Sequence, residues 1–235
     1  MDVQKAKNIF FLGIGGIGMS GIARYFHQKN VAVSGYDKTY SKITNDLEEE
    51  GIEIIYSDNT SELQDDIDLV IWTPAIKNQH PIYKYYENKG VPILKRSEVL
   101  GQLTHSYKTI AVAGTHGKTS VSTLIAHIFH NSKLGCSAFL GGISTNLGTN
   151  FIYNPNSEYC VVEADEFDRS FLSLNPFISV ITSCDADHLD IYKDAADLRS
   201  TFSSFASKTD PAGVLFVKKD SLYIYLLPRK ITTTV

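Results

Sequence analysis

Three glycines near the N-terminus have the spacing that brings a backbone turn close to a diphosphate. Gly13, Gly15 and Gly18 follow an apolar run in the order G-x-G-x-x-G. Such glycines let the chain pass under a pyrophosphate, and the amides and dipole of the following helix attract its charge. Asp37 ends the next apolar run, where a ribose-hydroxyl acceptor lies in such sites. The pattern predicts a pyrophosphate ligand and leaves NAD, FAD and UDP-sugars open; glycines that only permit close helix–strand packing are the alternative.

A second glycine-bearing turn has the composition of a triphosphate loop. Gly117, Lys118 and Thr119 form a G-K-[ST] core in "AVAGTHGKTSVSTLI". Loops of this type hold phosphate oxygens on backbone N–H groups, place the lysine on the β- and γ-phosphates and offer the hydroxyl to magnesium. The loop departs from the general pattern, because Val112 stands five positions before Gly117 and the remaining glycine is Gly114. Two phosphate sites on one chain favour a coupled reaction over hydride transfer.

Alternating strands and helices must position both turns. Periodicity predicts strands over 8–12 and 31–36 around a helix over 19–29. Further strands are expected at 68–76, 90–98, 109–113, 158–166, 177–188 and 213–218. Helices are expected at "YKYYENK", after the second turn and at about 194–207, and the segment 141–158 is expected to be a loop or irregular hairpin. The buried face of the helix after the second turn is expected to carry Val121, Leu124, Ile125, Ile128 and Phe129.

Composition limits the class of protein. The 235 residues are 43% hydrophobic and carry a formal charge of -4, which is typical of a soluble globular protein and argues against a nucleic-acid partner. Cys136, Cys160 and Cys184 are widely spaced in apolar surroundings and are expected to be reduced core thiols. Neither a membrane span nor a secretion signal is recognisable, so a cytoplasmic location is expected.

Four ordered motifs carry a resemblance to a known family. "GIGGIGMSGIA", "GTHGKTS", "EADE" at 163–166 and "DADHLDIY" at 185–192 are similar to the motifs of the Mur ligase family. The resemblance implies an α/β chain with a Rossmann-like UDP-binding domain at 1–106, and a boundary near Ser106. A partial P-loop ATPase α/β domain at 107–235 follows, and the C-terminal amino-acid-binding domain of the family is expected to be absent.

The resemblance also implies an activity, cofactors and partners. The first motif with "GTHGKT" is most similar to members that join L-alanine to UDP-N-acetylmuramate through an acyl phosphate, using ATP and Mg2+, in peptidoglycan precursor synthesis. The L-alanine site is expected beyond residue 235, so this chain is expected to bind the UDP-sugar without full turnover. A ligase that attaches a preformed tripeptide in cell-wall recycling, a noncatalytic UDP-sugar-binding module and a dehydrogenase remain as alternatives.

The roles of single residues are likewise implied by the resemblance. The expected catalytic residues are Lys118, Glu163 and His188, and the expected metal ligands are Thr119, Glu163 and His188. The expected ATP-binding residues are Gly114, Thr115, His116, Gly117, Lys118, Thr119 and Ser120. The expected substrate-binding residues are Gly13, Gly15, Gly16, Ile17, Gly18, Met19, Ser20, Asp37 and Thr73.

Some positions depart from the family or stay open. Members often carry a serine pair where this chain has "TPAI", so Thr73 can still donate a hydrogen bond but the backbone of Pro74 cannot. For Asp165, Glu166 and Asp168 a solvated acidic cluster is the alternative to a functional role. Lys193 is only a weak candidate for the carbamylated lysine that some relatives use.

Overall fold

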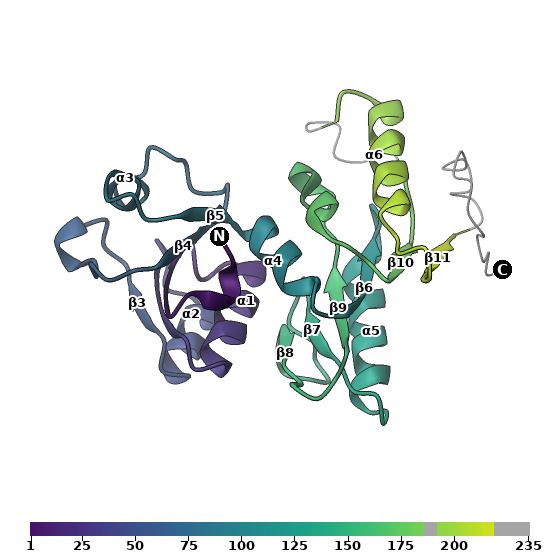
Figure 1. Cartoon of the computed structure of the whole chain (residues 1–235), viewed down its shortest axis with the longest axis horizontal. Helices are drawn as coiled ribbons and strands as arrows, with labels where there is room; N and C mark the ends of the chain where they lie inside the picture. Colours follow the sequence, from purple (N-terminus) through teal and green to yellow (C-terminus); the bar gives the residue numbers. More distant parts are fainter. Residues whose placement is uncertain (186–191, 219–235) are drawn as a thin grey trace. The chain divides into compact units, whose positions relative to one another are not determined.

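The computed structural model describes residues 1–185 and 192–218, and it forms two compact units (Figure 1). The first unit is Met1–Leu103, and the second begins at Thr104. This division lies three residues before Ser106, near which the sequence pattern restarts. Each unit contains its own mostly parallel sheet, so each is described by itself.

The first unit is a five-stranded sheet in the order β3-β2-β1-β4-β5 with every pairing parallel. Strand β1 lies in the centre, between β2 and β4, as expected for a Rossmann-like sheet. The strands are β1 Asn8–Leu12, β2 Ala32–Tyr36, β3 Glu53–Ile55, β4 Leu69–Trp72 and β5 Ile93–Lys95. The helices are α1 Ile17–Gln28, α2 Lys42–Glu49, α3 Pro81–Asn88 and α4 Arg96–Thr104, with short 3-10 turns at Val3–Lys5 and Thr60–Glu62.

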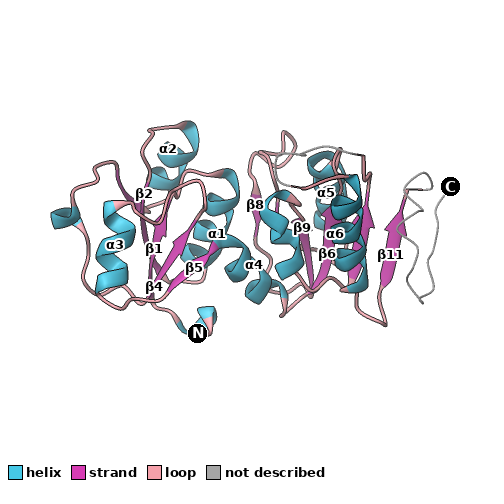
Figure 2. Ribbon diagram, turned by 90° about the horizontal axis from the view of Figure 1, so that it is seen from above, coloured by secondary structure: helices cyan, strands magenta, loops and turns pink. Residues whose placement is uncertain are grey.

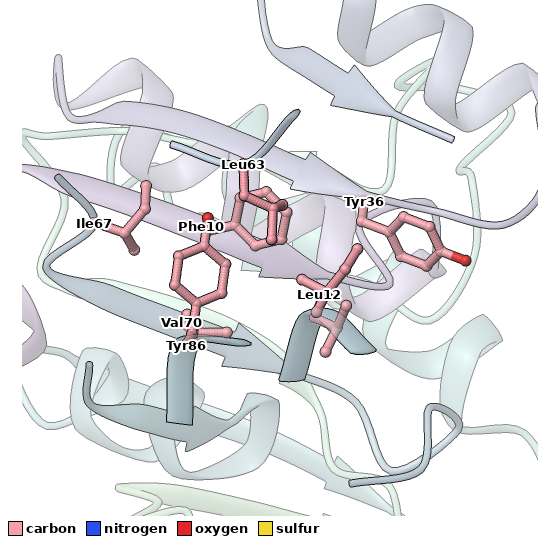
Figure 3. Close-up of a cluster of buried hydrophobic side chains, with 8 residues drawn as sticks. Phe10, Leu12, Tyr36, Leu63, Ile67, Val70 and Tyr86 are labelled. Carbon is pink, nitrogen blue, oxygen red and sulfur yellow. The ribbon is translucent and has the colours of Figure 1, made fainter. Parts of the chain in front are cut away.

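The core of the first unit explains why β1 lies in the centre. Its residues are apolar on both faces, as in parallel strands covered on both sides. Figure 3 shows Phe10 and Leu12 of β1 in a buried cluster with side chains from β2, β4 and α3. The cluster consists of Phe10, Leu12, Tyr36, Leu63, Ile67, Val70, Ile82 and Tyr86. This packing fixes the carboxyl end of β1, from which the first glycine turn starts.

The second unit is a six-stranded sheet in the order β11-β10-β6-β9-β7-β8 (Figure 2). Its pairings are parallel except that of β7 with β8, which is antiparallel. The segment 141–158, expected to be a loop or irregular hairpin, contains β8 and the loop that joins it to β7. The strands are β6 Lys108–Ala113, β7 Ser137–Phe139, β8 Phe151–Ile152, β9 Tyr159–Glu163, β10 Ile178–Ile181 and β11 Val214–Val217. The helices are α5 Lys118–His130 and α6 Ala195–Ser207, with a 3-10 segment η3 at Phe167–Ser173.

Several expected strands are shorter in the structure. The strand expected at 68–76 ends at Trp72, because a turn follows that the amide of Ile76 closes on the carbonyl of Thr73. The segment 90–98 contains only the short strand β5 before helix α4, whose start is stabilised by the Glu98 carboxylate accepting from the Lys95 amide at 2.7 Å. The strand expected at 177–188 is described only over Ile178–Ile181, and residues 186–191 lie outside the described part.

The buried face of α5 differs from the expected one. Leu124 and Ile128 are 58% and 57% exposed, whereas Ser122 and Ala126 are fully buried. Ile125 and Phe129 pack partly against the core of the second sheet. The helix is rotated about its axis, so that its buried positions lie one residue later in the chain than expected. Small side chains at these positions let the helix lie close to β6 and β9, which it contacts.

Two smaller findings complete the fold. The three cysteines are free and buried, as predicted. Burial raises the pKa of the Cys136 thiol to about 11, which suits an unreactive core thiol. Among the described residues, the structure contains no helix with both the length and the apolar character needed to cross a membrane.

Candidate functional site: two phosphate-type turns

The first glycine turn is tied to the strand beside it. The amides of Gly13 and Ile14 donate to the Tyr36 carbonyl at 2.8 and 3.0 Å, so the chain turns directly over the end of β2. The Asp37 carboxylate then accepts from the Gly15 amide at 2.8 Å and from the Thr39 amide at 3.0 Å. Asp37 therefore stabilises the turn itself, and its contact with a ribose hydroxyl stays a prediction.

Side chains that follow neighbouring strands lie against two glycines of this turn. A Cβ at Gly13, whose φ is +92°, would lie 2.7 Å from the Thr73 side chain, which follows β4. A Cβ at Gly18 would lie 2.6 Å from Nη1 of Arg96, which follows β5. The turn thus brings together Thr73, which the sequence predicted, and Arg96, which it missed. The available signal was a basic residue directly after a strand of the same sheet.

Met19 and Ser20 are buried at the start of α1, and the substrate-binding role expected for them stays a prediction. Their side chains are 2% and 0% exposed, and both amides donate to the Gly16 carbonyl. The Ser20 hydroxyl donates to the carbonyl of Ile17 at 3.0 Å. Both residues therefore stabilise the first turn of α1. In contrast, no hydrogen bond among the described residues uses the Gly18 amide, which lies at the second position of α1.

The second turn, between β6 and α5, is fastened by hydroxyls that follow β10. The Ser183 hydroxyl accepts from the His116 amide at 2.9 Å and pairs with the Thr115 hydroxyl at 2.9 Å. The Thr182 hydroxyl donates to the His116 carbonyl at 2.5 Å. Gly114, with φ +140°, has no room for a Cβ, which would lie 2.1 Å from Oγ1 of Thr182.

This fastening leaves a row of amides available at the start of α5. Within the described residues, no hydrogen bond uses the amides at positions 117–120, and Gly117 has the left-handed φ of +79° that aims the following amides in one direction. Such amides at a helix N-terminus form an anion site. The expected ATP-binding residues therefore lie together on one turn: Gly114, Thr115, His116, Gly117, Lys118, Thr119 and Ser120.

The loop lysine is held by a carboxylate that the sequence did not single out. The Lys118 ammonium donates to the Gly114 carbonyl and to Oε1 of Glu166, both at 2.8 Å. The side chain of Glu166 is fully buried and that of Lys118 is 14% exposed. Glu166 is thus not part of a solvated acidic cluster, whereas Asp165 is half-buried and the side chain of Asp168 lies outside the described set.

Thr119 and Glu163 lie beside two adjacent glycines. Glu163 ends β9, and its Oε2 accepts from the Gly141 amide at 3.1 Å. A Cβ at Gly142 would lie 3.2 Å from Cγ2 of Thr119. A hydroxyl and a carboxylate on neighbouring segments suit Mg2+, which takes one or two protein oxygens and completes its shell with water and phosphate. The residues present therefore fit the expected metal.

The remaining expected residues are not brought into this arrangement by the described structure. His188 belongs to the segment 186–191, which is outside the described residues. Lys193 is exposed, and its amide donates to the Asp197 carboxylate. In the described ranges no group of three or more His, Cys, Asp or Glu side chains gathers into a preformed metal cluster.

Two mostly parallel sheets, each with a glycine turn leading from a central strand into a helix, define an α/β protein of the phosphate-binding type. Comparison with known families is consistent with this class. Residues 8–108 match the catalytic domain of the Mur ligase family, and residues 112–234 match the Mur ligase middle domain. The chain therefore belongs to the Mur ligase family, as the motifs predicted.

Individual relatives are similar over nearly the whole chain. The UDP-N-acetylmuramate–L-alanine ligase of Phocaeicola vulgatus is 50% identical over 224 residues, which is 93% of this chain and 49% of the relative. The ligase of the same name from Parabacteroides distasonis is 45% identical over 93% of this chain and 48% of its own length. The chain thus spans about half the length of these curated relatives.

Solved structures share the fold. The crystal structure of UDP-N-acetylmuramate–alanine ligase from Thermotoga maritima has a TM-score of 0.84 and 30% identity, covering 96% of this chain and 52% of that one. The UDP-N-acetylmuramate:L-alanyl-gamma-D-glutamyl-meso-diaminopimelate ligase from Neisseria meningitides has a TM-score of 0.87 and 25% identity, covering 97% and 77%.

Proposed function

We propose that this chain carries the UDP-N-acetylmuramate and ATP sites of a ligase that joins L-alanine to UDP-N-acetylmuramate. The observation that carries the proposal is the loop at 114–120, with its available amides and its half-buried lysine, in a chain that is 50% identical to a curated relative of that activity. The amino acid is assigned from the relatives' names, since relatives of 43–50% identity over about nine-tenths of this chain share them.

In the first unit, the diphosphate of UDP-N-acetylmuramate would lie over the N-terminus of α1. The Gly18 amide and the helix dipole supply donors and partial positive charge. The Arg96 guanidinium, which lies against Gly18, adds a full charge, and the Thr73 hydroxyl next to Gly13 offers a further donor. The Gly15 amide already donates to Asp37, so Gly15 would contribute only by letting the backbone approach the diphosphate.

In the second unit, the amides at 117–120 would hold the phosphates of ATP, with Lys118 on the β- and γ-phosphates. Thr119 and Glu163 would hold Mg2+, and His188 stays assigned to the reacting end of the site on the family motif alone. The bound cation neutralises charge on the transferring phosphoryl group. Positioning and neutralisation are the main demands of phosphoryl transfer, and this residue set meets them.

The proposed reaction balances in two steps. A carboxylate oxygen of the sugar attacks the γ-phosphorus, the bond from that phosphorus to the β-bridging oxygen breaks, and ADP leaves with the electron pair. The amine of L-alanine then attacks the acyl carbon, phosphate leaves, and the amine loses a proton. The products are an amide, ADP and phosphate.

Calorimetry tests the proposal with this chain alone. We expect saturable 1:1 binding of UDP-N-acetylmuramate and of ATP with Mg2+, and no binding of NAD. Arg96→Ala, matched with Lys84→Ala on the exposed Lys84–Glu87 pair, should weaken binding of the UDP-sugar and leave binding of ATP unchanged. Binding of NAD in place of the UDP-sugar would instead support a dehydrogenase, and binding of the UDP-sugar without ATP would support a noncatalytic module.

A tripeptide-attaching ligase is the second candidate, favoured by the TM-score of 0.87 to the Neisseria enzyme. Identity favours the L-alanine activity, at 50% against 25%. Phosphate release measured with UDP-N-acetylmuramate, ATP and either L-alanine or the tripeptide separates the two if the chain turns over, because only the correct amine consumes the acyl phosphate. No release with either amine would agree with binding without turnover.

A further inference from the structure

One buried charge in the second unit has no role in the proposed reaction. Glu166 follows β9 by three residues, and its side chain is fully buried. A buried carboxylate is costly unless it is paired, so its retention calls for a function. Its cation is the lysine of the phosphate loop, with the Lys118 ammonium 2.8 Å from the carboxylate oxygens.

The backbone around Glu166 is fixed on several sides. Its carbonyl accepts from the Tyr192 hydroxyl at 2.6 Å and from the Arg169 amide at 2.9 Å. Phe171, in the same 3-10 segment, stacks on Phe205 of α6 with ring centroids 4.9 Å apart. These contacts fix the segment that carries the carboxylate beside the loop.

The ion pair cancels the charge that the loop would otherwise offer to a phosphate. Two of the three protons of the Lys118 ammonium go to the Gly114 carbonyl and to Glu166. The third can reach a phosphate oxygen, so Lys118 keeps its contact role. Its positive charge, however, is balanced by Glu166. The carboxylate of Glu163 adds a negative charge, because it is bonded to Gly141 and the adjacent Gly142 lies against Thr119.

We propose that Glu166, acting through Lys118, makes the phosphate loop selective for a nucleotide that arrives with a divalent cation. The inference rests on the proposed ATP site. A free triphosphate would bring its negative charges to a loop whose fixed side-chain charges already sum to a negative value, whereas a cation-bound triphosphate brings its own compensation. Glu166 is therefore a specificity-determining residue rather than a catalytic one.

The test compares nucleotide affinity with and without the cation. Calorimetry of the whole chain with ATP is carried out in excess Mg2+ and in excess EDTA, for the unaltered chain and for Glu166→Gln. We expect the unaltered chain to bind at least about a hundredfold more tightly with Mg2+, and Glu166→Gln to reduce this ratio by about tenfold, mainly by tighter binding in EDTA. Glu158→Gln, on the exposed Lys108–Glu158 pair, is the matched control and should leave the ratio unchanged.

Each outcome decides the point. A similar affinity with and without Mg2+ in the unaltered chain overturns the inference, as does a Glu166→Gln variant that loses affinity equally in both conditions, which would indicate a structural role only. If Glu166→Gln does not unfold cooperatively, Glu166→Leu supplies the uncharged side chain, and the unaltered chain alone still decides the first comparison. Absence of ATP binding in both conditions overturns the ATP site itself, and so is distinct from failure of this inference.

Discussion

The two glycine turns both lead from a central parallel strand into a helix, yet they differ in backbone and in charge. At the first turn, the residue before α1 is Gly16 in an extended conformation, and Asp37 accepts the Gly15 amide. At the second, the residue before α5 is Gly117 in the left-handed region, and the amides that follow are used by no other described residue. There the fixed carboxylate, Glu166, pairs with a lysine instead of with the backbone.

Under the proposed function, this difference adapts one supersecondary unit to two anions. A carboxylate on a backbone amide stabilises the first turn before any ligand binds and reduces its affinity for bare negative charge. A carboxylate on the lysine leaves the second row of amides available and sets the charge of the loop. The strand–turn–helix pattern alone therefore does not determine how an anion would be held. The neighbouring carboxylates determine which amides and which side-chain charge each turn offers.

The comparison is tested most strongly by removing the lysine. Lys118→Met should lower the free energy of unfolding by about 3 to 5 kcal/mol, because it leaves the buried Glu166 carboxylate without its cation. Urea denaturation measures the loss, and adding Glu166→Gln in the same chain should recover most of it. Lys108→Met, which breaks an exposed pair, should cost under about 1 kcal/mol. Equal losses for the two lysine variants would contradict the buried-pair account.

The glycines give the next largest contrast. Gly114→Ala should lower stability by about 3 kcal/mol, because φ is +140° and the added Cβ would meet Thr182 and Ser183. Gly16→Ala should cost under about 1 kcal/mol, since the nearest atom to its Cβ is 3.5 Å away. Thermal unfolding of both variants under one set of conditions measures the difference, and a larger loss for Gly16→Ala would refute the steric argument.

Substitutions of Asp37 test the first turn and should change the free energy of unfolding by a smaller amount. Asp37→Ala should cost about 1 to 2 kcal/mol, because the Gly15 and Thr39 amides lose their acceptor. Asp37→Asn keeps an acceptor oxygen and should cost less than half as much. Chemical denaturation gives both values, and an Asn variant as unstable as the Ala variant would show that charge, not the hydrogen bond, stabilises the turn.

The smallest expected effect is a pH dependence of the segment that carries Glu166. The pKa of Asp197 is lowered, first by the Lys193 amide and then by Arg169, whose guanidinium donates to both carboxylate oxygens. A lowered pKa means that the stabilisation is present above the ordinary value of 3.8 and is lost as pH falls through the folded pKa. Asp197→Asn should therefore lower the melting temperature slightly at pH 7 and have no effect at pH 2; an unchanged difference at both pH values would argue against the pair.

Local patterns predicted the elements that carry the turns. Strand β1, helix α1 and helix α6 were readable because their apolar period is long and continuous. The first residues of helix α4 were included in the strand expected at 90–98 and its remainder was not predicted, since its residues have almost no helical amphipathic period. Helix α2 was missed, although its Ser41 and Thr44 form a capping box that could have indicated it.

Of the candidate site, the sequence indicated the residues whose role is tied to the backbone. The turn at 114–120 was predicted because glycine, lysine and threonine at fixed spacing have a local meaning. Arg96 and Glu166 were missed because each depends on tertiary packing, across strands for Arg96 and into the loop for Glu166. Glu166 stands in an acidic stretch of the sequence, which gives no sign that this side chain is buried.

Phe171 stacks on Phe205, so the segment that carries Glu166 is packed against the aromatic core of the second unit. A mutational scan scored by ATP retention would mark Phe205 as a sensitive position, although its ring is fully buried and belongs to α6. Maps of inactivating changes would therefore spread from the loop through Glu166 into that helix, and such positions should be sorted by melting temperature before any is assigned to ligand contact.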